Sequence, residues 1–249
     1  MMVHRLKCAE VWGGIKNTDV DVCSSGMTVS LYSSSCDGGK GGDAYYFSVC
    51  GADRVSRLVL ADVVGHGEQV SQISQWVYEQ MTTRLDDPDL PGLLSELNNR
   101  VVTRGFQALT TAAVASYYVD LKQMYYCYAG HPPMLVRRGG ERWREVPLRA
   151  SETAGDANLP LGVSEDVRYD MSDVRLGTGD DLLLFSDGVL EARDDDGKLF
   201  GMDRLRAALQ EAGDVEPMKI KSDVLNKLRA WTGGALRHDD VTLIAIRVA

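Results

Sequence analysis

Four aspartates stand beside short apolar segments, and each has a glycine or another sharp turn next to it. They are Asp43, Asp62, Asp187 and Asp239. Carboxylates at strand ends can converge at one edge of a sheet, while adjacent glycines let backbone carbonyls and ligands approach closely. Crowded carboxylates repel one another, so such a cluster normally requires a cation, and oxygen ligands alone favour Mg²⁺ or Mn²⁺. For each aspartate taken singly, the alternative is a turn residue or a helix cap.

Composition excludes several classes of protein. The chain has 249 residues, a formal net charge of −9 and 44% hydrophobic residues, which is typical of a globular protein and not of a disordered one. The acidic balance argues against a nucleic-acid partner. No apolar run is long enough to span a membrane and the start has no signal-peptide pattern, so we expect a cytoplasmic protein. Five cysteines without CxxC spacing agree with a reducing compartment.

The elements that must position the aspartates can be predicted from residue periodicity. Alternating and β-branched residues indicate strands, and apolar residues at helical spacing indicate helices. The predicted strands are 27–32, 44–50, 57–63, 111–120, 123–128, 134–137, 143–146, 181–186 and 241–248, and the predicted helices are 68–84, a segment around 93–101, 203–210 and 218–231. Because strands and helices are grouped rather than strictly alternating, we expect an α+β fold with antiparallel sheets.

The aspartates belong to six short motifs that resemble those of the metal-dependent protein phosphatases, the PPM or protein phosphatase 2C-like family, in the bacterial branch typified by sporulation stage II protein E. The motifs are, in chain order, Gly-Gly-Asp43, Ala-Asp62-Val-Val-Gly-His-Gly67, Ala129-Gly-His-Pro-Pro133, Leu159-Pro-Leu-Gly162, Phe185-Ser-Asp187-Gly and Asp239-Asp-Val-Thr242. The resemblance implies one phosphatase domain over residues 1–249. This would be a four-layer sandwich, with two central antiparallel β-sheets flanked by helix pairs and the metal site at one edge.

The resemblance also implies a centre of two Mn²⁺ or Mg²⁺ ions. Asp62 would bridge both ions, Asp187 and Asp239 would complete one site, and Asp43 with the backbone carbonyl of Val63 would complete the other. Water would supply the remaining ligands. A water bridging the two ions would attack the phosphorus of a phosphoserine or phosphothreonine in line.

Two histidines are candidates for the acid that protonates the leaving alkoxide, or for a contact to the phosphate. His66 lies in a glycine turn four residues after Asp62, and His131 precedes two prolines. The alternative for each is a structural hydrogen bond that fixes its loop. Asp240 is expected to cap backbone groups beside Asp239, although either member of this pair could be the ligand.

No arginine clearly matches the phosphate-binding arginine of the family's eukaryotic branch. Arg54, Arg57 and Arg237 are the available substitutes, and a solvated surface position is the alternative for each. The helix predicted at 68–85 starts directly after the Asp62 loop. We hypothesise that it couples contacts with a partner or a second copy to metal affinity, and a plain core helix is the alternative.

These observations predict a protein serine/threonine phosphatase. Its substrate would be a phosphorylated bacterial regulatory protein, for which the family suggests an anti-sigma-factor antagonist. Two alternatives remain open: an inactive pseudophosphatase that binds a partner, and a phosphatase for small phosphate esters. No nucleic-acid or membrane partner is expected, and a homodimer is left open.

Overall fold

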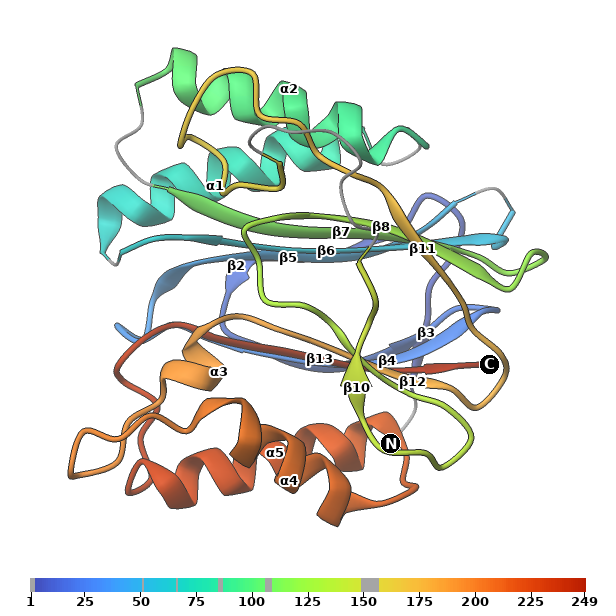
Figure 1. The fold of residues 1–249 in the computed structure, drawn as a ribbon, viewed down its shortest axis with the longest axis vertical. Coiled ribbons are helices and arrows are strands. Elements are labelled where there is room, and N and C mark those ends of the chain that lie inside the picture. Colours follow the sequence, from blue (N-terminus) through green and yellow to red (C-terminus); the bar gives the residue numbers. More distant parts are fainter. Residues whose placement is uncertain (1–2, 51, 66, 85–86, 106–108, 149–156) are drawn as a thin grey trace.

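The computed structural model describes residues 3–50, 52–65, 67–84, 87–105, 109–148 and 157–249. Over these residues the chain forms two β-sheets and five helices (Figure 1). The strands are β1 (His4–Arg5), β2 (Val11–Lys16), β3 (Thr18–Cys23), β4 (Met27–Ser34), β5 (Lys40–Cys50), β6 (Val55–Val63), β7 (Thr110–Tyr118), β8 (Gln123–Ala129), β9 (Leu135–Arg137), β10 (Arg144–Glu145), β11 (Ser172–Arg175), β12 (Asp181–Phe185) and β13 (Val241–Val248). The helices are α1 (Glu68–Thr82), α2 (Leu90–Thr103), α3 (Gly188–Glu191), α4 (Gly201–Ala212) and α5 (Pro217–Trp231).

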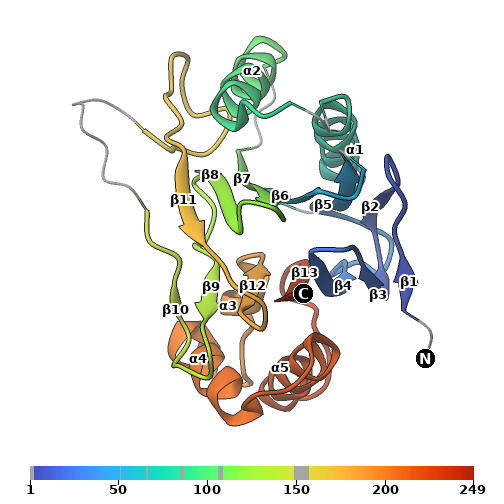
Figure 2. The same cartoon turned by 90° about the vertical axis from the view of Figure 1, so that its right-hand side faces the viewer.

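Two sheets stack face to face between two pairs of helices (Figures 1 and 2). One sheet has the strand order β11-β8-β7-β6-β5-β2, and the other has the order β1-β3-β4-β13-β12-β9-β10. All strand pairs between named elements are antiparallel except β1 with β3, which is parallel. The predicted α+β sandwich is therefore confirmed, with this one parallel pair as a correction.

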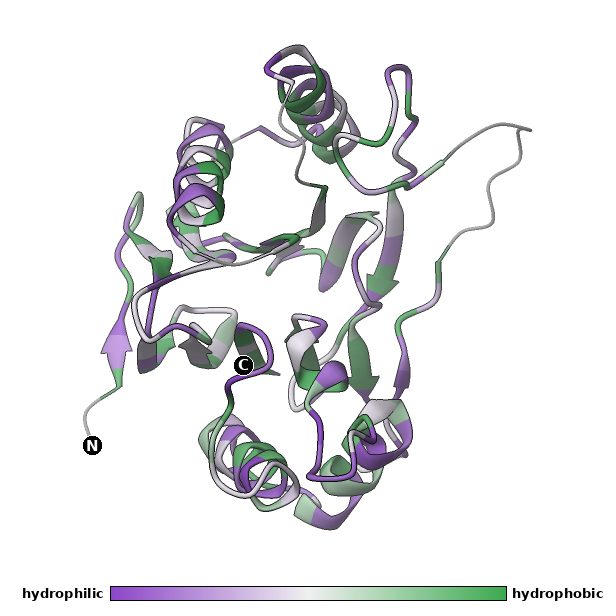
Figure 3. Cartoon of the chain, turned by 90° about the vertical axis from the view of Figure 1, so that its left-hand side faces the viewer, coloured by the Kyte–Doolittle hydropathy of each residue, from purple (hydrophilic) through white to green (hydrophobic). Residues whose placement is uncertain are grey.

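Three apolar cores hold the layers together. The first fills the space between the sheets, the second lies under α1 and α2, and the third lies under α4 and α5. Each helix shows hydrophilic and hydrophobic residues in alternation along its coil, as expected when one face is buried (Figure 3). No helix of the described residues is long and apolar enough to cross a membrane.

Most predicted elements are present, with shifts at their ends. The predicted strands 44–50 and 57–63 are β5 and β6, which pair antiparallel, and α1 ends at Thr82. β5 begins earlier than predicted, at Lys40, because the glycines at 41 and 42 continue the strand instead of forming a turn. The prediction omitted β1, β2, β3, β11 and α3. β2 and β3 were missed because glycine and aspartate interrupt their apolar pattern.

Candidate active site

Asp43 and Asp62 form a cross-strand pair in the six-stranded sheet. The register of β5 with β6 places the two residues directly opposite each other. On the same sheet face, Tyr45 and Leu60 belong to the core between the two sheets, so the aspartates lie where this core ends. Asp43 is 1% exposed and Asp62 is 7% exposed. Two carboxylates thus lie side by side in an environment that disfavours their charge.

The other sheet contributes Asp187 and Asp239. Asp187 follows β12 and stands at the start of the short helix α3, where its backbone carbonyl accepts hydrogen bonds from Leu190 and Glu191. Asp239 lies two residues before β13. Because β12 and β13 are adjacent and antiparallel, the end of one and the start of the other lie at the same edge of their sheet. The structure therefore brings all four predicted aspartates to one end of the sandwich.

The pKa values of these carboxyl groups reflect this crowding. Burial raises the pKa of Asp62 well above its usual range, and the charges of Asp43, Asp187 and Asp239 raise it further. Burial also raises the pKa of Asp43 to about 8 and that of Asp239 to about 6. The cluster is electrostatically unfavourable without a cation.

Asp240 has a different set of contacts. Its side chain is buried and accepts the backbone N–H of Cys36, at 2.7 Å, and that of Gly42. Its carboxylate therefore holds the Cys36–Gly42 segment against β13, as expected for a backbone cap. This arrangement favours Asp239 over Asp240 as the residue available for a ligand.

Two glycines permit this close packing. A Cβ on Gly42 would lie 2.6 Å from the carbonyl oxygen of Val63, and a Cβ on Gly188 would lie 2.0 Å from the backbone oxygen of Asp240. Neither approach is possible for a residue with a side chain. Glycine at position 42 thus leaves room beside the Val63 carbonyl, which the sequence resemblance assigns to the metal site.

The donor set suits a hard divalent cation. Both carboxylate oxygens of Asp43 are buried and have no partner at hydrogen-bond geometry in the described part of the chain. The hydroxyls of Thr242 and Ser186 are near enough to oppose the rise in its pKa, but they bond to Ser33 and to the Asp240 carbonyl. Unpartnered buried carboxylate oxygens are costly unless a cation binds them. Within the described ranges, no three His, Cys, Asp or Glu side chains are placed closely enough to enclose a metal ion without moving. The chemistry of the residues fits the predicted cations, while the structure does not show the coordination geometry.

His131 lies beside this cluster. It is 7% exposed, and its Nδ1 donates to the backbone carbonyl of Pro132 at 2.9 Å. Its Nε2 is buried and has no hydrogen-bond partner among the described residues. Burial lowers the pKa of His131 to about 4, although the charge of Asp187 opposes this effect. The imidazole is therefore neutral near pH 7, with Nε2 available as an acceptor. His66 lies outside the described residues.

The three candidate arginines are not brought together. Arg54 is exposed and pairs with Asp120 at the far end of the β5–β6 hairpin. Arg237 is exposed near Asp239. Arg57 is 1% exposed and donates to the Ser116 hydroxyl and to the carbonyls of Arg84 and Asp87. Arg57 is thus an interior residue that caps the chain after α1, and it is neither a phosphate ligand nor a surface charge.

Helix α1 contacts β5 through two serines that sequence patterns did not single out. Ser71 Oγ donates to the Lys40 carbonyl and Ser74 Oγ donates to the Gly42 carbonyl, each at 2.7 Å. A small hydroxyl residue at a buried helical position is the only sequence signal for such a contact. The two bonds link α1 to the backbone directly before Asp43.

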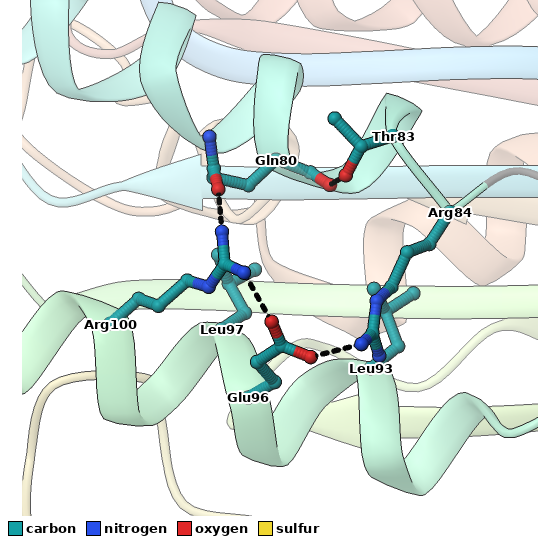
Figure 4. A pocket seen from close by; sticks show the side chains of 7 residues that line it. All are labelled: Gln80, Thr83, Arg84, Leu93, Glu96, Leu97 and Arg100. Atoms are coloured by element: carbon teal, nitrogen blue, oxygen red, sulfur yellow. Dashed lines mark hydrogen bonds and ion pairs between the residues drawn. The ribbon is translucent and has the colours of Figure 1, made fainter.

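A small pocket on the outer surface lies between α1 and α2, away from the aspartates (Figure 4). Glu96 of α2 forms an ion pair with Arg84 and accepts a hydrogen bond from Arg100, which also donates to Gln80 of α1. These contacts tie the two helices together. Because its polar groups are already paired with one another, the pocket is a helix–helix contact and carries no evident chemistry.

A family model and a curated relative indicate the same family for this chain. The model of the Stage II sporulation protein E (SpoIIE) family matches residues 52–249. Phosphoserine phosphatase RsbU of Bacillus subtilis (strain 168) is 31% identical over 212 residues, which cover 83% of this chain and 59% of RsbU. The chain therefore spans less than two thirds of the length of this relative.

Two solved structures share the fold. The RsbU and RsbW domains of Rv1364c from Mycobacterium tuberculosis are 23% identical, with a TM-score of 0.76 over 94% of this chain and 62% of that one. RsbX in complex with magnesium is 16% identical, with a TM-score of 0.68 over 93% of this chain and 100% of that one.

Proposed function

This chain belongs to the SpoIIE family of protein phosphatase 2C-like proteins, and from that premise we propose that it is a metal-dependent protein serine/threonine phosphatase. The observation that supports the proposal most strongly is the pair of buried, unpartnered Asp43 oxygens opposite Asp62, at the sandwich end where Asp187 and Asp239 also lie. A phosphatase with a metal centre requires such a set of oxygen ligands, and a purely structural cluster would not.

The ligands that we propose are those expected from the sequence: Asp43, Asp62, Asp187, Asp239 and the carbonyl of Val63. When bound there, two Mn²⁺ or Mg²⁺ ions would supply an activated water for attack on phosphorus and would neutralise the phosphoryl oxygens. The solved structure of RsbX with magnesium shows that a protein of this fold binds such a cation.

Several residues of the chain hold the proposed ligands in position. The β5–β6 register holds Asp43 against Asp62. Asp240 fixes the segment before Asp43 by accepting the backbone N–H groups of Cys36 and Gly42. His131 is neutral at pH 7 and burial disfavours its protonated form, so its Nε2 would accept a hydrogen bond rather than deliver a proton. We therefore propose His131 as a residue that orients water or a phosphoryl-bound proton, with His66 retained as the candidate acid.

The substrate that we propose is a phosphoserine or phosphothreonine on a bacterial regulatory protein in the cytoplasm. This proposal draws on RsbU, which is named as a phosphoserine phosphatase, and on Rv1364c, in which an RsbU domain shares a chain with an RsbW domain. An anti-sigma-factor antagonist is the substrate class that fits such a circuit. We also propose that residues 1–249 act as one phosphatase domain.

A regulatory role for α1 is part of the same proposal. Because Ser71 and Ser74 bond to the carbonyls of Lys40 and Gly42, a shift of α1 along its axis would move the backbone next to Asp43. Contacts of a partner or a second copy with α1 would then change metal affinity. Substitutions of Trp76 and Tyr78 that preserve charge test this idea, and unaltered metal affinity and turnover would contradict it.

One assay tests the function. Mn²⁺-dependent hydrolysis of an aryl phosphate and of a phosphoserine protein is measured for the parent, Asp62→Asn and Asp187→Asn. We expect both activities in the parent and the loss of at least a hundredfold in either variant, since each removes a charged ligand from the centre. Full activity in both variants would refute the site. Inactivity of the parent with every divalent metal would favour the pseudophosphatase, and hydrolysis of the aryl phosphate alone would favour a small-ester enzyme.

A further inference from the structure

The sheet face that carries the aspartates continues into an exposed aliphatic residue. Alternate residues of a strand project from the same face, so Leu58, Leu60 and Asp62 of β6 share one side. The backbone N–H of Val64 donates to the Leu109 carbonyl at 2.9 Å, which extends the ladder one residue past β6 and keeps Val64 on that side. Leu58 and Leu60 are buried between the sheets, whereas Val64 is 53% exposed.

Leu109 lies directly opposite Val64. The register of β6 with β7 pairs Val63 with Thr110, so the next pair outward is Val64 with Leu109. Opposed residues of an antiparallel ladder have Cβ atoms roughly 5 Å apart. Leu109 is 41% exposed. Two aliphatic side chains therefore lie next to each other at the strand ends, beyond the carboxylates.

A buried asparagine holds the turn that follows the bridge between Thr110 and Leu161. Leu161 and Thr110 exchange two backbone hydrogen bonds, of 2.8 and 3.1 Å, which places the following turn alongside Leu109. Asn98 of α2 is 1% exposed, and its side chain accepts from the Gly162 N–H and donates to the Ser164 carbonyl, each at 2.9 Å. The segment before β11 accordingly lies beside α2 (Figure 2).

We name Val64 and Leu109 the strand-end patch. Its side chains are exposed, but the backbone that carries them is held by sheet hydrogen bonds. Little conformational entropy would therefore be lost when a ligand covers the patch.

We propose that the strand-end patch is a specificity subsite that receives an aliphatic side chain of a phosphoprotein substrate, two positions from its phosphoserine. The proposal rests on the proposed function, because it assumes that the phosphate binds at the aspartates. Val64 is two residues from Asp62, a span of about 7 Å along a strand. Two residues of an extended peptide cover the same distance. The patch adjoins the catalytic cluster on one continuous face, and this continuity argues for a substrate segment as its occupant.

The test compares phosphoserine peptides that differ only two positions before or after the phosphoserine, where they carry leucine or serine. The readout is the ratio of kcat/KM for the leucine peptide to that for the serine peptide. We expect a ratio of roughly tenfold in the parent, since contact of one aliphatic side chain with an apolar surface discriminates on about this scale. Leu109→Ser should bring the ratio towards one.

Leu121→Ser is the matched control, because Leu121 is 57% exposed and follows the opposite end of β7. It should keep the ratio of the parent. A variant that folds poorly or binds metal weakly loses activity on both peptides, so its ratio still reports the subsite. A parent without a preference, or a Leu109→Ser variant with the parent's ratio, would overturn the subsite alone. Turnover of an aryl phosphate but of no phosphopeptide would instead refute the protein phosphatase function, and the subsite with it.

Discussion

Asp43→Asn should change how the stability of the metal-free protein depends on pH. Burial raises the pKa of Asp43 from 3.8 to about 8. When the pKa of a carboxyl group is higher in the folded than in the unfolded state, the group contributes its full stabilisation at pH values below the unfolded pKa. This contribution is lost as the pH rises towards the folded pKa, because the unfolded chain ionises first. The chelated parent should therefore become less stable between pH 5 and pH 8.

The size of the effect follows from the same shift. Each pH unit within this window removes about 1.4 kcal/mol, so three units remove about 4 kcal/mol from the free energy of unfolding. The raised pKa values of Asp62 and Asp239 act in the same direction. Asparagine does not ionise, so the variant should lose the part of this pH dependence that Asp43 contributes and keep the part that comes from Asp62 and Asp239. Its buried amide would cost about 1–3 kcal/mol at every pH.

The assay is urea unfolding in EDTA at pH 5 and pH 8, repeated with Mn²⁺ or Mg²⁺ in excess. Metal at about a hundred times its Kd should return about 3 kcal/mol to the parent at pH 8, because the ionised carboxylates are its ligands. Asp181→Asn is the control: Asp181 is as buried as Asp43 but pairs with Arg137 and Arg247. Asp181→Asn should be less stable than the parent at both pH values. The difference in its free energy of unfolding between pH 5 and pH 8 should remain. Equal stability of the chelated parent at pH 5 and pH 8 would refute the reasoning.

Three other predictions concern the packing around the site. Gly188→Ala should lower the free energy of unfolding by about 1–3 kcal/mol in urea, because its Cβ would lie 2.0 Å from the Asp240 oxygen, whereas Gly177→Ala, with its nearest atom at 3.9 Å, should be nearly neutral. Ser74→Ala removes the hydrogen bond to Gly42 and should raise the Mn²⁺ concentration for half-maximal stabilisation by about two- to tenfold, and an unchanged midpoint would contradict the link from α1. Thermal unfolding should also show a lower Tm in chelator than in Mn²⁺ for the parent, and a smaller difference for Asp62→Asn.

The sequence alone determined the types and order of most elements. Alternation in 57–63 and 241–248 and helical spacing in 218–231 reflect burial on one or two faces, which is a local property of each segment. The residue types also indicated a cation site with oxygen ligands, because four aspartates beside glycines or sharp turns are harder to explain as turn residues than one is. Asp43 was expected just before a strand and lies inside β5, because isolated glycines could not be distinguished from a turn.

Only the tertiary structure decided which side chains meet. Asp43 faces Asp62 through the pairing of β5 with β6, and Asp239 reaches the same place because β13 pairs with β12 in the other sheet. Arg57, a candidate phosphate ligand by residue type, is buried against Ser116 and the chain after α1. Strand register and sheet stacking depend on the packing of residues far apart in the chain, so no local pattern encodes them. The chemistry of the site was present in the residue types, and its location at one end of the sandwich arose from those long-range pairings.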